Sequence, residues 1–276
     1  MNEPILQAEG LSFAYEGGRH VLEDLSFAVR PGERVAVLGG NGAGKSTFFL
    51  CLNGVLSPHH GEIRLHGEPV TKSSLNVLRA KVGMVFQNAD DQIIAPTVLA
   101  EISFGPMNLR LPRAEVERRV NEAIAFMGLE DFRARPPHYL SGGEKKRVAI
   151  ADILAMEPEV ILFDEPQAAL DPEGAALLEG VLDDLHAAGK TLLISTHDMD
   201  FAYRWADRIV VFCAGEIIAD GAPDAVFGDS AVLSRAGLRR PVLFEVAASL
   251  RRAGVLAADA PAPRTPAELD KLLEGA

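Results

Sequence analysis

GGNGAGKSTFF, residues 39–49, combines four glycines with one lysine and two hydroxyl side chains. Residues 39–46 have the spacing G-x-x-x-x-G-K-S of a phosphate-binding loop. The apolar run at 35–38 predicts a buried strand before this loop, and residues 46–53 predict a helix after it. Glycine lets the backbone turn its N–H groups inward, and a helix N-terminus adds partial positive charge. The stretch therefore predicts an α/β fold that binds a polyphosphate, and the alternative is a glycine-rich turn without a ligand.

The residues of this loop suit the parts of a nucleotide. Lys45 is expected to reach the β- and γ-phosphates, and the Ser46 hydroxyl is expected to bind Mg²⁺. The expected cradle comprises Gly39, Gly40, Asn41, Gly42, Ala43, Gly44, Lys45, Ser46 and Thr47.

Composition limits the classes of protein to consider. The 276 residues are 48% hydrophobic and 24% charged, as in ordinary globular proteins. No apolar run approaches the length of a membrane-spanning helix, and the N-terminal residues lack the features of a signal peptide. Cys51 and Cys213 have apolar neighbours and are interpreted as core residues, which indicates the cytoplasm. The net charge of −12 disfavours nucleic acid and anionic lipid as partners, although a protein partner can still bring the chain to a membrane.

Three further apolar runs end in polar side chains. Residues 159–165, EVILFDE, predict a buried strand whose Asp164 would hold Mg²⁺ and whose Glu165 would orient or deprotonate water. His197 follows the run at 191–195 and is a candidate contact for the γ-phosphate, although a histidine is also a common structural residue. Gln87 follows the run at 82–86 and is a candidate Mg²⁺ ligand, but on its own it is equally ambiguous.

LSGGEKKRVAIA, residues 140–151, predicts a second helix N-terminus able to bind an anion. Its candidate contacts are Ser141, Gly142, Gly143 and Glu144. One triphosphate does not need two cradles on one chain. We therefore expect the second cradle to complete a site on another copy of the chain.

These motifs together resemble the ATP-binding cassette (ABC) ATPases over residues 4–225. LSGGEKKR resembles the signature motif of that family, AALD at 168–171 its dimer-facing loop, and STHD at 195–198 its histidine switch. The resemblance implies that Tyr15 stacks on adenine, that Gln87 senses Mg²⁺, and that ATP is hydrolysed by Glu165, His197 and Lys45. Glu144 stands where the family more often has glutamine.

The resemblance also implies the organisation of the chain. Residues 1–235 would form the ABC ATPase domain, with a P-loop core at 33–87 and 158–213. An antiparallel β subdomain would come from 1–30 and 60–75, and a helical subdomain from about 88–156. In the latter, Val116, Val120, Ile124 and Met127 have the spacing of one helix face. Residues 236–276 predict an extension in which a proline-rich link joins an amphipathic helix to a short terminal helix, either a dimer contact or a loosely packed tail.

Residues 85–109, VFQNADDQIIAPTVLAEISFGPMNL, resemble the ATPases of energy-coupling-factor importers, most of all those for cobalt and nickel. This implies a peripheral location on the cytoplasmic face of the cell membrane. The implied partners are a second copy or a paralogous ATPase and transmembrane subunits, one of which would dock on residues 93–96. The alternatives are a vitamin importer of the same type, another ABC importer or exporter, and a soluble ABC ATPase that transports nothing.

Overall fold

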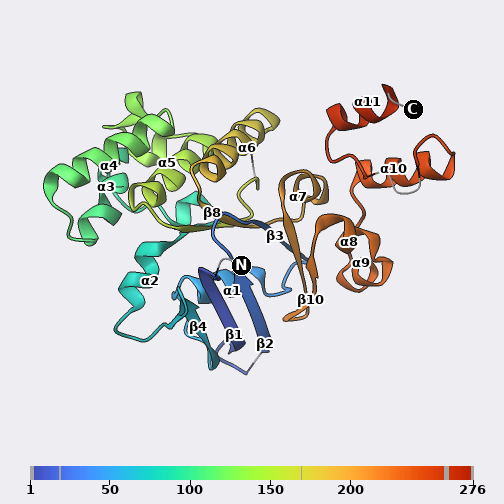
Figure 1. The fold of residues 1–276 in the computed structure, drawn as a ribbon. Coiled ribbons are helices and arrows are strands. Elements are labelled where there is room, and N and C mark those ends of the chain that lie inside the picture. The colour runs from blue at the N-terminus through green and yellow to red at the C-terminus, as the bar shows by residue number, and fades with distance from the viewer. Residues whose placement is uncertain (1–2, 19, 169, 258–260, 275–276) are drawn as a thin grey trace.

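Two sheets organise the chain in the computed structural model, which describes residues 3–18, 20–168, 170–257 and 261–274 (Figure 1). The smaller sheet is antiparallel and has the order β2-β1-β4-β5. Its strands are β1 (Leu6–Ala14), β2 (His20–Val29), β4 (His60–Leu65) and β5 (Glu68–Pro69). The antiparallel layer predicted from residues 1–30 and 60–75 is thus confirmed.

The larger sheet has the order β10-β9-β3-β8-β7-β6. Its strands are β3 (Arg34–Gly39), β6 (Val82–Val85), β7 (Val160–Asp164), β8 (Thr191–Ser195), β9 (Arg208–Cys213) and β10 (Glu216–Gly221). All pairs in it are parallel except β9 with the edge strand β10. Because parallel strands end at the same edge of a sheet, the polar residues that follow β3, β6, β7 and β8 are brought to one side.

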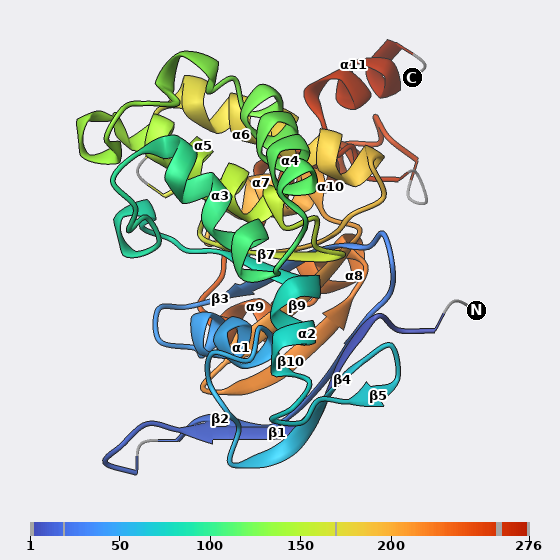
Figure 2. The ribbon, with the colours of Figure 1, turned by 90° about the vertical axis from the view of Figure 1, so that its left-hand side faces the viewer.

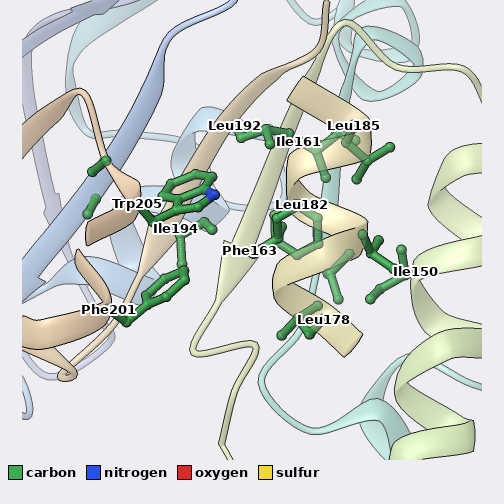
Figure 3. Packing of buried hydrophobic residues seen from close by; sticks show 14 of the residues in the cluster. Ile150, Ile161, Phe163, Leu178, Leu182, Leu185, Leu192, Ile194, Phe201 and Trp205 are labelled. Atoms are coloured by element: carbon green, nitrogen blue, oxygen red, sulfur yellow. The ribbon is translucent and has the colours of Figure 1, made fainter. Parts of the chain in front are cut away.

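Alternate residues of these parallel strands enter two separate cores. Val35 and Val37 of β3 belong to the core shared with the antiparallel sheet, whereas Ala36 and Leu38 belong to the core under the helices. In the second core, three leucines of α6 (Pro172–Ala187) pack between the sheet and α5 (Gly142–Ala155) (Figure 3). Burial on both faces explains why these strands read as continuous apolar runs.

The expected helical subdomain lies over the β6 end of the large sheet (Figures 1 and 2). Its helices are α3 (Val98–Asn108), α4 (Arg113–Phe126) and α5 (Gly142–Ala155), with 3₁₀ turns η1 (Ala89–Asp91), η2 (Glu130–Phe132) and η3 (Pro137–Tyr139). On α4, Val120 and Ile124 are buried and Val116 is partly buried, so the predicted apolar face is confirmed. Two further helices, α1 (Lys45–Leu52) and α2 (Leu75–Lys81), follow β3 and β5.

The C-terminal helices lie at the other end of the large sheet (Figure 1). They are α7 (Met199–Trp205), α8 (Pro223–Gly228), α9 (Ser230–Ala236), α10 (Val242–Arg252) and α11 (Pro266–Glu274). Both predicted helices of the extension are therefore present, and residues 258–260 of the predicted link lie outside the described residues.

The extension is attached to α7. Arg264 donates a hydrogen bond to the carbonyl oxygen of Ala206 at 2.6 Å, and its guanidinium lies 5.5 Å from the ring centre of Tyr203. Asp200 accepts hydrogen bonds from the backbone N–H of Val242 at 2.6 Å and from Arg239 at 3.1 Å. Beyond these contacts, α11 has no buried residue in its described length.

The helices of the described residues include none that combines the length and the apolar character needed to cross a bilayer.

Candidate active site

The phosphate-binding loop opens onto a cavity of about 530 Å³, here called the cradle cavity. Its walls are Tyr15, Val21, Asn41, Gly42, Ala43, Gly44, Lys45, Ser46, Thr47, Gln87, Glu165 and His197. The structure therefore brings residues from four strand ends and the antiparallel layer to one place, as the sequence predicted. Gly39 and Gly40 are not part of this wall, but their carbonyl oxygens accept hydrogen bonds from Lys45 Nζ at 2.8 and 3.3 Å.

The loop can take this shape because of its glycines. Gly42 and Gly44 have φ of 75° and 107°, values that other residues rarely adopt. A Cβ on Gly39 would lie 2.5 Å from the carbonyl oxygen of Phe212 in β9. On the side of β9, the loop backbone therefore packs so closely that a side chain would not fit. The other side of the loop faces the cradle cavity, where a ligand can bind.

Lys45 is the buried cation of this cavity, with 7% of its surface exposed. Burial lowers the pKa of its ammonium, and the carboxylates of Glu165 and Asp164 act in the opposite direction. Its Nζ lies 3.9 Å from Glu165 Oε1. Because it is desolvated and its carboxylate partner is at the limit of ion-pair distance, the ammonium is well placed to gain from an anionic phosphate.

Glu165 lies in the wall of the cradle cavity between Lys45 and His197. Its Oε2 lies 2.6 Å from Nδ1 of His197, which is otherwise exposed. Its backbone has φ of 45°, in the left-handed region, and its N–H donates to the carbonyl and hydroxyl oxygens of Ser195 at 3.1 and 3.0 Å. The backbone is thus held in an uncommon conformation that directs the carboxylate toward Lys45 and His197.

Asp164 is placed below the cavity wall rather than in it. It is 6% exposed, and its Oδ1 accepts a hydrogen bond of 2.5 Å from the Ser195 hydroxyl. Ser195 is a supporting residue of the site that the sequence analysis missed, since its hydroxyl contacts both Asp164 and the Glu165 N–H. A hydroxyl residue directly after the apolar residues 192–194 was the available signal, and the register pairs it directly with Asp164.

Tyr15 projects from the antiparallel layer at the cavity mouth. It is 45% exposed, its hydroxyl lies 3.2 Å from Thr47 Oγ1, and Phe13 packs edge-on against its ring at 5.0 Å. A ring held at its edge and hydroxyl but otherwise open can stack on a planar group. This geometry suits the adenine contact expected of Tyr15.

Residues 141–144 of LSGGE line a second cavity, also of about 530 Å³, here called the signature cavity, whereas Leu140 is buried in the core. It is lined by Met127, Ser141, Gly142, Gly143, Glu144, Lys146, Arg147, Ile150, Leu170, Asp171, Glu173, Gly174, Leu177, Leu178 and Val181. Among the described residues, none lines both cavities. The two predicted cradles are therefore separate cavities within one copy of the chain. This separation is expected if a complete ATP site combines the cradle of one copy with the signature of another. Of the AALD loop, Leu170 and Asp171 line the signature cavity, and residue 169 lies outside the described part of the chain.

Ser141 and Glu144 cap α5 reciprocally. The Ser141 hydroxyl accepts from the Glu144 N–H at 3.3 Å, and Glu144 Oε2 accepts from the Ser141 N–H at 2.6 Å. This backbone hydrogen bond holds the pKa of Glu144 below its usual range. The glutamate at this position therefore fixes the start of α5, a role that the S-x-x-E pattern could have predicted.

Known proteins resemble this chain over most of its length. The family model described as ABC transporter matches residues 22–168. The energy-coupling factor transporter ATP-binding protein EcfA of Methanocaldococcus jannaschii is 51% identical over 239 residues, which cover 86% of each chain. The cobalt import ATP-binding protein CbiO of Rhodobacter capsulatus is 48% identical over 264 residues, covering 95% of this chain and 94% of the relative.

Solved structures agree with this likeness. CbiO1 of Clostridium perfringens, described as part of the transporter complex CbiONQ, superposes with a TM-score of 0.74 at 38% identity and covers 89% of this chain and 99% of its own. A dimeric ATP-binding cassette in a post-hydrolysis state, bound to ADP and Pi, gives a TM-score of 0.71 at 28% identity, with 79% and 98% covered.

Proposed function

The chain belongs to the ABC transporter family as an ATPase of the energy-coupling-factor type, and we propose that it energises the uptake of cobalt or nickel ions. The observation that carries hydrolysis is the cradle cavity, where Lys45, Glu165 and His197 meet beside the phosphate-binding loop. The metal rests on the resemblance of residues 85–109 and on the likeness to CbiO. The likeness to EcfA is of similar strength and its name specifies no cargo, so a vitamin importer is the alternative.

In the proposed reaction, the loop N–H groups and Lys45 bind the β- and γ-phosphates of ATP. Glu165 orients the attacking water and accepts its proton, since one carboxylate oxygen faces Lys45 and the other faces His197. His197 is exposed on its other side and can donate to the γ-phosphate. Tyr15 stacks on the adenine.

The proposed Mg²⁺ fits the chemistry of its three candidate ligands, two of which line the cradle cavity while Asp164 lies below its wall. Ser46 and Gln87 line the cradle cavity, and Asp164 keeps one carboxylate oxygen beyond the one bonded to Ser195. Hydroxyl, amide and carboxylate oxygens are the ligands that Mg²⁺ prefers. The ion would neutralise charge on the β- and γ-phosphates, while these residues hold it in place.

We propose that the active form is a dimer in which each signature cavity covers the cradle of its partner. Ser141, Gly142, Gly143 and Glu144 would then face the γ-phosphate at the N-terminus of α5, an anion-binding position. The intact motifs on one chain are sufficient for a homodimer, although a paralogous ATPase could replace one copy. The C-terminal extension is a second proposed contact, because it leaves Val242 of α10, Val255 after α10 and Leu273 of α11 exposed.

A membrane subunit is proposed to dock beside the helical subdomain. Ile94 is 73% exposed, and Leu99, Phe104 and Met107 of α3 are also exposed. We call these four residues the docking surface. Phe104 and Met107 are one helical turn apart, and Leu99 is about two turns from Met107. The expectation for residues 93–96 needs correction at Ile93, which packs partly against the core, while Ile94 and Pro96 are exposed. This surface supports a peripheral position on the cytoplasmic face of the membrane.

Uptake of labelled cobalt and nickel by cells with and without this chain tests the proposal. We expect accumulation of one or both metals to require the chain with Glu165 intact. If neither metal depends on it while uptake of a vitamin does, the cargo is wrong but the ATPase assignment is unaffected. Hydrolysis by the purified chain and its membrane partners is measured separately.

A further inference from the structure

A buried ammonium group lies between the two cavities. Lys146 of α5 is 5% exposed, and its Nζ donates to the carbonyl oxygens of Phe86 at 3.0 Å and Gln87 at 2.6 Å. Burial lowers its pKa to about 8, despite the nearby carboxylate of Asp164. Burying a lysine is costly, and an apolar side chain would fill the same volume more favourably. Packing therefore does not account for a lysine at this position.

Gln92 makes the reciprocal connection from the loop to the helix. Its Oε1 accepts a hydrogen bond from the Phe86 N–H at 3.2 Å, and its Nε2 donates to the Ala149 carbonyl oxygen at 2.8 Å and to Asp152 at 3.3 Å. Residues 86–92 are therefore tied to α5 at both ends, by Lys146 at the start of the loop and by Gln92 at its end. We call this pair of contacts the α5 clasp.

The same helix is pressed against β6. A Cβ on Gly83 would lie only 2.3 Å from Cγ2 of Ile153, so the Ile153 side chain of α5 packs directly on the β6 backbone at this point. Helix α5, β6 and the segment after β6 are thus joined by close packing along one part of the helix and by hydrogen bonds along the other. We therefore expect α5, β6 and the segment after β6 to move together as a rigid body.

The clasp connects residues assigned to different ATP sites. Gln87 lines the cradle cavity of its own chain, whereas Ser141 begins α5 in the signature cavity. Lys146 is less than two helical turns from Ser141 and also lines the signature cavity.

We propose that Lys146 and Gln92 are positioning residues that fasten Gln87 to α5, so that nucleotide in one cradle sets the position of the signature offered to the partner. This rests on the proposed function, because it assigns the two cavities to two ATP sites. Neither residue touches the reacting atoms. Their role is to make Gln87 and Ser141 move together.

The test compares Lys146→Met with Lys190→Met. Lys190 is a matched control, because burial also lowers its pKa and its Nζ donates to a backbone carbonyl, that of Pro158, at 2.7 Å. In the nucleotide-free protein, amide hydrogen exchange across 86–93 should become faster in Lys146→Met than in the parent or Lys190→Met, with exchange across 39–47 unchanged. This readout does not depend on hydrolysis.

In turnover, Lys146→Met should lower kcat by about tenfold to a hundredfold, because the two halves of each site are misplaced. Its affinity for ATP should stay within about twofold of the parent, because Lys146 donates to Phe86 and Gln87 and not to the phosphate-binding loop at 39–47. Gln92→Leu should give the same pattern and is decisive if Lys146→Met does not fold.

Unchanged exchange across 86–93, or a kcat equal to that of Lys190→Met, would overturn the proposal. Equal losses of kcat and ATP affinity would also overturn it, since they would indicate a general structural role. If the parent chain fails to hydrolyse ATP with its partners, the proposed function fails, and the exchange result still reports on the clasp.

Discussion

Replacing Glu144 by glutamine should have opposite effects on the isolated chain and on its ATP-bound dimer. In the isolated chain, the Glu144 carboxylate accepts a charge-assisted hydrogen bond from the Ser141 N–H at the start of α5. In the proposed dimer, the same negative charge faces the triphosphate of the partner. Glu144→Gln keeps an acceptor for the cap but removes the charge.

The two magnitudes can be worked from this geometry. Loss of a negative charge at an exposed helix N-terminus costs about 0.5 kcal/mol of unfolding free energy, a melting shift of about 1–2 °C for a chain of this size. A carboxylate about 8 Å from one phosphate charge is repelled by about 0.5 kcal/mol in water and about 2 kcal/mol at an effective dielectric constant of about 20. Taking about 1 kcal/mol for each of two sites, the dimer should form with about thirtyfold higher affinity.

Thermal unfolding without nucleotide and sedimentation with ATP measure the two effects, the latter in a Glu165→Gln background that prevents turnover. Asp229→Asn is the control, because Asp229 caps α9 away from both cavities. It should lower the melting temperature without changing dimerisation. Equal or weaker dimerisation of Glu144→Gln would refute the placement of this carboxylate opposite the triphosphate.

The stability effect should also depend on pH. The lowered pKa of Glu144 means that its cap stabilises the fold fully above the ordinary glutamate pKa of about 4.3. This stabilisation is lost as the pH falls through the lower folded value. The difference in melting temperature between the parent and Glu144→Gln should therefore disappear at acidic pH.

Three further predictions concern the cradle and the shared sites. Glu165→Gln should bind ATP like the parent but hydrolyse it about a thousandfold more slowly, whereas Lys45→Ala should bind ATP about tenfold to a hundredfold more weakly; equilibrium binding and single-turnover hydrolysis separate the two. Mixing Lys45→Ala chains with Ser141→Arg chains should restore activity in dimers that keep one intact site, and silent mixed dimers would count against shared sites. Gly39→Ala should lower the melting temperature by about 5 °C because of its 2.5 Å contact with a backbone oxygen, whereas Gly180→Ala, with no atom within 4 Å, should not.

The cradle was predictable from sequence because its signals are local. The residues around Lys45 combine an apolar strand, glycines and a helix start within one short stretch, and each of these has a direct conformational consequence. The convergence of Glu165, His197 and Gln87 then follows from parallel pairing alone. Their strands end at the same edge of one sheet.

The supporting polar contacts were not predictable in this way. Lys146 reaches residues 59 and 60 positions away, and Ser195 reaches Asp164 across 31 positions. In sequence, Lys146 is one of several charged residues on an amphipathic helix, and charge on such a helix usually indicates a solvated face. Its burial depends on the way α5 packs against β6, which no local pattern encodes.

The proposed docking surface would also constrain how the chain is made in a cell. Ile94, Phe104 and Met107 stay in water for as long as a newly synthesised copy has no membrane subunit to cover them. Apolar surface of this kind drives copies to associate with one another. Copies made in excess of the membrane subunit would therefore be lost to self-association or to quality control. Balanced synthesis of the two subunits, rather than abundant synthesis of the ATPase, should set how many transporters a cell assembles.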